Sequence, residues 1–99
     1  MNPGKVIRER VKALTDLPNI GRAMAEDLQL LGIDNPEQLK GRDPYGLYQE
    51  LSIATGQRQD PCVLDTFISI TRFMDGDEAR PWWAYTAERK AAMQQRSDH

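Results

Sequence analysis

The sequence predicts an all-α protein, a single compact domain of about five to six helices, and three observations indicate this class. First, the 99 residues, 39% of them hydrophobic, are enough for one modest core. Second, apolar residues recur at helical spacing, and no segment alternates apolar and polar residues with the period of two that is typical of strands. Third, short turns separate the apolar segments, and no Gly-rich linker divides the chain.

Two helices are expected in the first third of the chain. A helix over residues 4–15 is predicted by three apolar residues that share one face, Ile7, Val11 and Leu14. A second helix is expected over residues 22–31, with an inward face made by Met24, Leu28 and Leu31. Gly32 suits the left-handed conformation that ends many helices. The segment between the two helices, residues 17–21, is too short to be a strand.

Three further helices each begin with a capping residue followed by proline. Asn35-Pro36 opens a short helix, and Gln38 is placed to complete a capping box. Asp43-Pro44 opens a helix that ends near Gly56. Asp60-Pro61 opens a helix whose broad apolar face predicts the most buried position in the bundle. That face is made by Val63, Leu64, Phe67, Ile68 and Phe73.

The polar turn Asp75-Gly76-Asp77 ends this helix, and Pro81 precedes a last helix over residues 82–95. We therefore divide the chain into residues 1–79, a bundle that contains the hairpin described below, and residues 80–99. The second part is an aromatic and basic helix with its tail, packed on the same domain.

Several classes of function find no support in the composition. Cys62 is the single cysteine and His99 the single histidine, which excludes an internal disulfide and the usual zinc sites. Because no histidine is placed to act as a base, we expect Cys62 to be a small packing residue and not a nucleophile. The P-loop motif of nucleotide-binding proteins, the dinucleotide-binding fingerprint and the calcium-loop motif are absent. We therefore expect no enzyme, no metal and no cofactor.

No apolar run approaches the about 18 residues that a membrane span requires. The N-terminal sequence MNPGKVIRER lacks the apolar core of a secretory signal. These observations predict a cytoplasmic protein that has no membrane partner.

The net charge of -2 is unevenly distributed along the chain. Residues 1–22 carry +3, residues 23–79 carry -7 and residues 80–99 carry +2. The acidic total argues against a protein that binds nucleic acid with its whole surface, but it allows a local basic face near the N-terminal segment.

The most informative stretch is LPNIGRAMAEDLQLLGI, from Leu17 to Ile33. The first N–H groups of the helix expected after Gly21 lack intrahelical acceptors and lie at the positive end of the helix dipole. Gly21 has no Cβ and tolerates a positive φ, so a phosphate could approach these groups closely. Asn19 stands where such hairpins usually have their first glycine; it tolerates the left-handed conformation but adds a side chain near the binding edge. Arg22 could add a charged contact. The predicted phosphate site is Asn19, Ile20, Gly21 and Arg22.

This stretch resembles the helix-hairpin-helix proteins. From about Leu14 to Ala91 the chain more narrowly resembles the small bacterial family called "pathogenicity locus" proteins, some of whose members are labelled mitomycin-resistance proteins. The features that carry the resemblance are LTDLPNIGRAMAEDLQLLGI, DPCVLDTFISITRFM and RPWWAYTAERK. The resemblance implies a helical fold of the SAM-like or helix-hairpin-helix type and a DNA-related role.

Trp82 and Trp83 provide a candidate second surface. Consecutive helical residues point about 100° apart, so the two indoles cannot both face one groove of the core. One of them is expected to stay partly exposed, where it could stack on a base or on a partner protein. The alternative is that both indoles pack against the bundle and that the basic residues nearby form a solvated face.

Two functions from different classes remain open at this point. In the first, the hairpin binds the DNA backbone, duplex or single-stranded, without reading sequence, and serves DNA repair or damage tolerance. One hairpin would bind weakly, with a log–log salt slope of about -2 to -3 for two or three phosphates. Supporting contacts are expected from Arg8, Lys12, Trp82, Arg89 and Lys90. In the second, the hairpin is a structural corner, and the chain is an interaction module for an unknown protein partner. Basic side chains gathered around the hairpin would favour the first.

Overall fold

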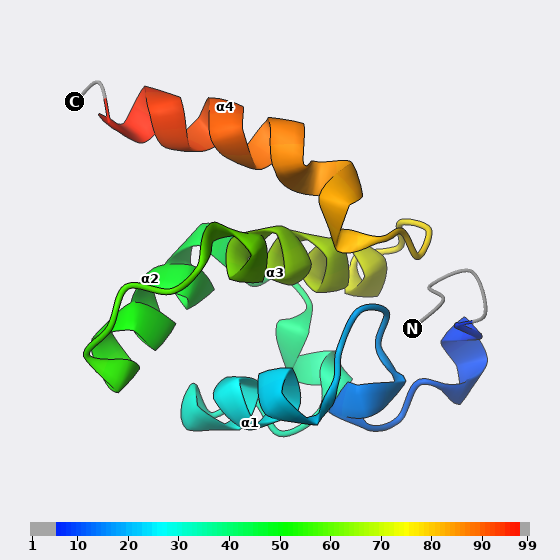
Figure 1. The fold of residues 1–99 in the computed structure, drawn as a ribbon. Helices are drawn as coiled ribbons and strands as arrows, with labels where there is room; N and C mark the ends of the chain where they lie inside the picture. Colours follow the sequence, from blue (N-terminus) through cyan, green and yellow to red (C-terminus); the bar gives the residue numbers. More distant parts are fainter. Residues whose placement is uncertain (1–5, 98–99) are drawn as a thin grey trace.

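The computed structural model describes residues 6–97, with side chains described as far as Gln95, and this part of the chain is all-helical. Its α-helices are α1 (Arg22–Leu30), α2 (Pro44–Thr55), α3 (Pro61–Met74) and α4 (Thr86–Ser97). Its short 3-10 turns are η2 (Arg8–Arg10), η3 (Leu14–Asp16), η4 (Pro36–Leu39) and η5 (Trp82–Tyr85). Figure 1 shows α3 in the middle of the molecule, with α4 along one side and α1 on the other.

The central position of α3 follows from its sequence and confirms the prediction. Its apolar residues cover most of its circumference. Every residue from Leu64 to Thr71 is buried, and so is Phe73. The helix contacts η4, α2, η5 and α4, whereas α1 packs on α2 and η3. Hydrophobic burial on this scale is the main term that stabilises a small helical domain.

The capping signals of the middle helices are also confirmed. The Asp43 carboxylate accepts a hydrogen bond of 3.0 Å from the N–H of Tyr45 at the start of α2. The Asp60 carboxylate accepts one of 3.0 Å from the N–H of Cys62 at the start of α3. Gly56 ends α2 in the left-handed conformation, with φ of 67°. Local sequence decides these three ends because each contact lies within one helical turn.

The segment Asn35-Pro36 also begins a helical turn, although the turn is η4 and not an α-helix. The side-chain oxygen of Gln38 accepts hydrogen bonds from the N–H groups of Asp34 and Asn35, at 2.5 and 3.2 Å. The expected contact of Gln38 with the turn start is therefore present.

The predicted helix over residues 4–15 is wrong for the part that the structure describes; residues 4 and 5 lie outside it. Residues 6–16 form the turns η2 and η3, separated by extended backbone. Two contacts compete with a helix here. The Asp16 carboxylate accepts hydrogen bonds from the N–H groups of Ala13 and Lys12, which also hold its pKa below the usual value. The Arg8 side chain meanwhile reaches the end of α3.

The last predicted helix is present but begins differently. Its first residues, Trp82 to Tyr85, form η5, and α4 starts at Thr86. Among the described residues there are thus four α-helices joined by 3-10 turns, where the sequence analysis expected about five to six helices.

A buried ion pair attaches α4 to α3. The carboxylate of Asp65 on α3, whose side chain is fully buried, accepts a hydrogen bond of 2.9 Å from Arg89 and one of 2.7 Å from the hydroxyl of Thr86. Burial of a carboxylate is tolerated here because both of its oxygens have charged or polar donors.

Candidate nucleic-acid interface

The loop between η3 and α1 contains the predicted left-handed residue. Asn19 has φ of 66°, and it is the one non-glycine residue with a positive φ among those described. Its neighbours Leu17, Pro18 and Ile20 are buried, so the loop is anchored by apolar side chains on both sides of the turn. The loop is followed by the helix α1, as the sequence predicts. The first arm is the single turn η3, so a complete helix-hairpin-helix motif is not present in the described structure.

The side chain of Asn19 turns inward, away from the position near the binding edge that the sequence analysis expected. Its amide nitrogen donates a hydrogen bond of 2.7 Å to the carbonyl oxygen of Arg80 and one of 3.2 Å to the hydroxyl of Ser69 on α3. The carboxamide therefore joins the hairpin to the core helix and to the segment that precedes η5. Sequence reasoning missed Ser69 and Arg80 because contacts over 50 and 61 positions leave no local pattern.

Gly21 is the N-cap of α1 and is exposed, with an extended backbone at φ of -95°. The residue of the hairpin with a positive φ is thus Asn19. Gly21 has a negative φ, so its backbone conformation is one that other residues also adopt. A Cβ built on Gly21 meets no atom of the described protein within 4 Å. Neither backbone conformation nor internal packing therefore requires glycine at this helix start. The bare N-cap leaves the first N–H groups of α1 open to a group from outside.

The other two residues of the predicted site divide into one that points inward and one that points outward. Ile20 is 1% exposed, so its side chain belongs to the core and only its backbone borders the loop surface. The side chain of Arg22 is 93% exposed and lies 3.6 Å from Glu26, one turn further along α1. An ion pair this exposed is weak, which leaves the guanidinium available to a stronger anion.

The segment from Arg80 to Trp83 lies beside the hairpin because Asn19 binds the carbonyl oxygen of Arg80. The side chain of Arg80 is exposed. Trp82 and Trp83 are 37% and 62% exposed, and their rings meet edge to face with centroids 5.5 Å apart. Trp83 is therefore largely open to solvent, as the sequence analysis expected of one indole, and Trp82 is mostly covered but keeps part of its surface exposed. In Figure 1 the loop after η3 rises toward the end of α3, where the chain also turns back into η5.

Of the expected supporting residues, two have partners within the fold. Arg8 donates hydrogen bonds to the carbonyl oxygens of Phe73 and Asp77, and its guanidinium lies 4.1 Å from the centroid of the Phe73 ring. Arg89 is bound to buried Asp65. We therefore do not include either arginine among the DNA contacts proposed below. Lys12 and Lys90 are exposed.

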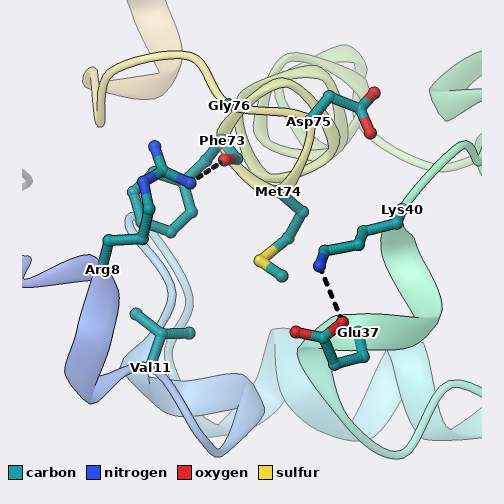
Figure 2. A pocket seen from close by; sticks show the side chains of 8 residues that line it. All are labelled: Arg8, Val11, Glu37, Lys40, Phe73, Met74, Asp75 and Gly76. Atoms are coloured by element: carbon teal, nitrogen blue, oxygen red, sulfur yellow. Dashed lines mark hydrogen bonds and ion pairs between the residues drawn. The ribbon is translucent and has the colours of Figure 1, made fainter.

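An open cleft of about 290 Å³ lies on the side of the molecule where the N-terminal segment, η4 and the end of α3 meet. Figure 2 shows its charged side chains engaged with the protein itself: Arg8 with the carbonyl of Phe73, and Lys40 with Glu37 at 2.8 Å. The cleft thus offers mainly paired charges and the Met74 side chain to a ligand, and we assign no site to it.

The remaining candidate groups do not gather into a reactive centre in the described part of the chain. Burial raises the pKa of the Cys62 thiol, and the hydrogen bond and negative charge of Asp60 raise it further, so the thiol is protonated at neutral pH. No group of three or more metal-ligating side chains occurs among the described residues. Within the same residues, each helix is too short or too polar to span a lipid bilayer.

Comparison with known proteins gives a family and a relative. The sequence model of the family described as "Pathogenicity locus" (Cdd1) matches residues 7–91. The protein named "Mitomycin resistance protein McrB" of Streptomyces lavendulae is 51% identical over 80 residues, which cover 81% of this chain and 76% of the relative. No solved structure gives a significant match. The region matched by the family model includes the hairpin, α3 and the Arg80–Trp83 segment. The chain therefore belongs to the Pathogenicity locus family.

Proposed function

We propose that this protein binds the sugar–phosphate backbone of DNA through the start of α1, without reading base sequence and without catalysis. The observation that carries the proposal is Gly21: the fold does not require glycine there, yet its missing Cβ leaves the helix start bare. A phosphate oxygen seated at this point would accept hydrogen bonds from the N–H groups of Arg22, Ala23 and Met24. These contacts position a protein on DNA but carry no sequence information.

Charge around the loop supports the same proposal. Arg22 and Arg80 are both exposed. Arg22 is the first residue of α1, and Arg80 lies beside the hairpin because its carbonyl oxygen is bound by Asn19. We expect both to bind phosphates that flank the one bound by the backbone, because guanidinium groups bind phosphate with directed hydrogen bonds. With two or three phosphates in contact, the affinity is weak and falls with salt at a log–log slope of about -2 to -3.

The biological setting that we propose is tolerance of DNA damage. The relative from Streptomyces lavendulae is named as a mitomycin resistance protein, which is compatible with this setting. A domain that holds DNA backbone without sequence preference suits such a role, because damage occurs at any sequence.

The alternative is a protein-interaction module in which the hairpin only connects two packed helical segments and binds no ligand. Two large apolar side chains favour it: Ile53 on α2 is 81% exposed and Leu30 on α1 is 63% exposed. The acidic character of residues 23–79 would suit a basic partner. In this case the start of α1 would be unaffected by DNA.

Fluorescence anisotropy of labelled duplex and single-stranded DNA, titrated at low and moderate salt, separates the two. We expect the wild type to bind with the shallow salt slope given above. Gly21→Asp should weaken binding by about ten-fold or more, because its carboxylate would occupy the N–H groups and repel phosphate. The variant should fold at least as stably as the wild type, since aspartate is a better N-cap than glycine.

The matched control is Gln57→Glu, which adds the same charge at an exposed position just beyond α2. At moderate salt it should bind DNA within about two-fold of the wild type, because a solvent-exposed charge that does not touch the start of α1 is largely screened. Absence of wild-type binding at low salt, or equal binding by Gly21→Asp, would contradict the proposed function.

A further inference from the structure

The two tryptophans of the chain lie side by side on the surface, with Trp83 mostly exposed and Trp82 mostly covered by the fold. Trp83 is 62% exposed and Trp82 is 37% exposed, although neighbouring Tyr85 is buried. Burying an indole is among the most favourable changes available to an apolar side chain, so two adjacent exposed indoles mark a surface that meets another molecule.

The position of the pair points to what that molecule is. The hydrogen bond between Asn19 and the carbonyl oxygen of Arg80 connects the hairpin to this segment. Gly21 lies two residues from Asn19, and Trp82 lies two residues from Arg80. Since successive Cα atoms are 3.8 Å apart, each end is at most about 8 Å from the residue that makes the connection. A single strand held by its phosphate at Gly21 could therefore bring its following bases to the indoles.

The geometry of the pair suits an unpaired base better than a duplex. The rings are almost perpendicular, at 85°, so the two indoles do not stack face to face on each other, and Trp83 keeps most of its surface exposed. The bases of a duplex already stack on each other, whereas an unpaired base exposes its face to an aromatic ring. Exposed Arg80 beside the pair supplies the charge that attracts the strand.

We propose that Trp82 and Trp83 form a stacking platform for unpaired bases, so that the DNA ligand of this protein is single-stranded or contains an unpaired segment. The proposal rests on the proposed function, since the hairpin holds the backbone of the same strand. It makes Trp83, the more exposed of the two, the residue that discriminates single-stranded from duplex DNA.

The test compares an oligothymidylate with a duplex of equal length, using anisotropy and the intrinsic tryptophan fluorescence. Because Trp82 and Trp83 are the two tryptophans of the chain, the emission reports on the platform alone. We expect single strands to quench the emission and to bind more tightly than duplex. Trp83→Ala should weaken single-strand binding by about ten-fold and leave duplex binding within about two-fold. Trp83→Phe should keep most of the single-strand affinity, because a phenyl ring also stacks.

The possible failures are distinguishable. If Trp83→Ala binds single strands as tightly as the wild type while Gly21→Asp weakens both DNA forms, the platform is refuted and the hairpin proposal stands. If the wild type binds neither DNA form, both proposals fall. If the emission shifts with protein concentration in the absence of DNA, the pair lies in an interface between protein chains, which also overturns the platform. Equal thermal unfolding curves of the variants and the wild type provide the folding control.

Discussion

The side-chain amide of Asn19 donates a hydrogen bond of 2.7 Å to the carbonyl oxygen of Arg80, across 61 positions of sequence. The same amide donates to the hydroxyl of Ser69 on α3, and that hydroxyl donates onward to the carbonyl oxygen of Thr66. A single residue in a left-handed conformation thus holds the hairpin against the core helix and the aromatic segment. The candidate DNA surface depends on this connection, because its two halves come from distant parts of the chain.

Two substitutions of Asn19 separate its side-chain and backbone contributions. Asn19→Gly removes the hydrogen bonds but adopts a positive φ without strain, so we expect a loss of about 1 kcal/mol in the free energy of unfolding. Asn19→Ala removes the same hydrogen bonds and also the tolerance of asparagine for the left-handed region, so it should cost more, about 2 kcal/mol. Urea unfolding measures both. An equal loss in the two variants would show that the backbone conformation is not strained for alanine.

Arg8 should contribute to the fold and not to DNA binding. Arg8→Ala removes the contacts with the end of α3, and we expect a loss of about 1–2 kcal/mol in unfolding free energy. Hydrogen exchange should become faster at the N–H of Arg10, which is bonded to Ile7 in η2. The control, Arg10→Ala, removes an exposed side chain of the same turn and should leave stability nearly unchanged. A loss of DNA affinity in Arg8→Ala that exceeds the loss in Arg10→Ala would contradict this assignment.

The ion pair between Asp65 and Arg89 should be strongly coupled. Asp65→Leu leaves the largely buried guanidinium of Arg89 without its partner and should cost about 3–5 kcal/mol. Adding Arg89→Met should recover much of this loss, because an apolar pair avoids the cost of burying charge. Glu50→Gln, which removes a half-exposed pair with Arg42 at 3.4 Å, should change stability by less than about 1 kcal/mol. Additive losses in the double variant would show that the two residues do not depend on each other.

The N-cap of α3 should make stability depend on acidic pH. The hydrogen bond from the N–H of Cys62 holds the pKa of Asp60 below its usual value of 3.8. The ionised cap therefore stabilises the fold above pH 3.8, and the contribution is lost as the pH falls through the lowered pKa of the folded state. Asp60→Asn keeps a good cap that does not titrate. In unfolding measurements between pH 5 and pH 2, the wild type should lose stability relative to this variant, and a constant difference would refute the linkage.

The parts of the fold that the sequence predicts are those with local causes. The starts of α2 and α3 depend on Asp43 and Asp60, whose carboxylates bind an N–H two residues away. The central position of α3 follows from apolar residues that cover most of its surface. The left-handed conformation of Asn19 follows from its place in the hairpin pattern.

The parts that the sequence does not predict depend on distant contacts. Ile7, Val11 and Leu14 have helical spacing, but contacts of Arg8 with the end of α3 compete with a helix over residues 4–15. The inward rotation of the Asn19 side chain and the burial of Arg89 also require partners far away in the sequence. One sequence carries no signal for such pairs, so the basic residues expected at the DNA surface could not be separated from those used by the fold.

The most direct test of the central claim is amide NMR of the protein during titration with DNA. If phosphate binds at the start of α1, the largest chemical-shift changes should occur at the amides of Gly21, Arg22, Ala23 and Met24. Gly21→Asp should abolish these changes while the rest of the spectrum stays that of a folded protein. Changes centred instead on the exposed residues Leu30 and Ile53, or no changes at low salt, would contradict DNA binding by the hairpin.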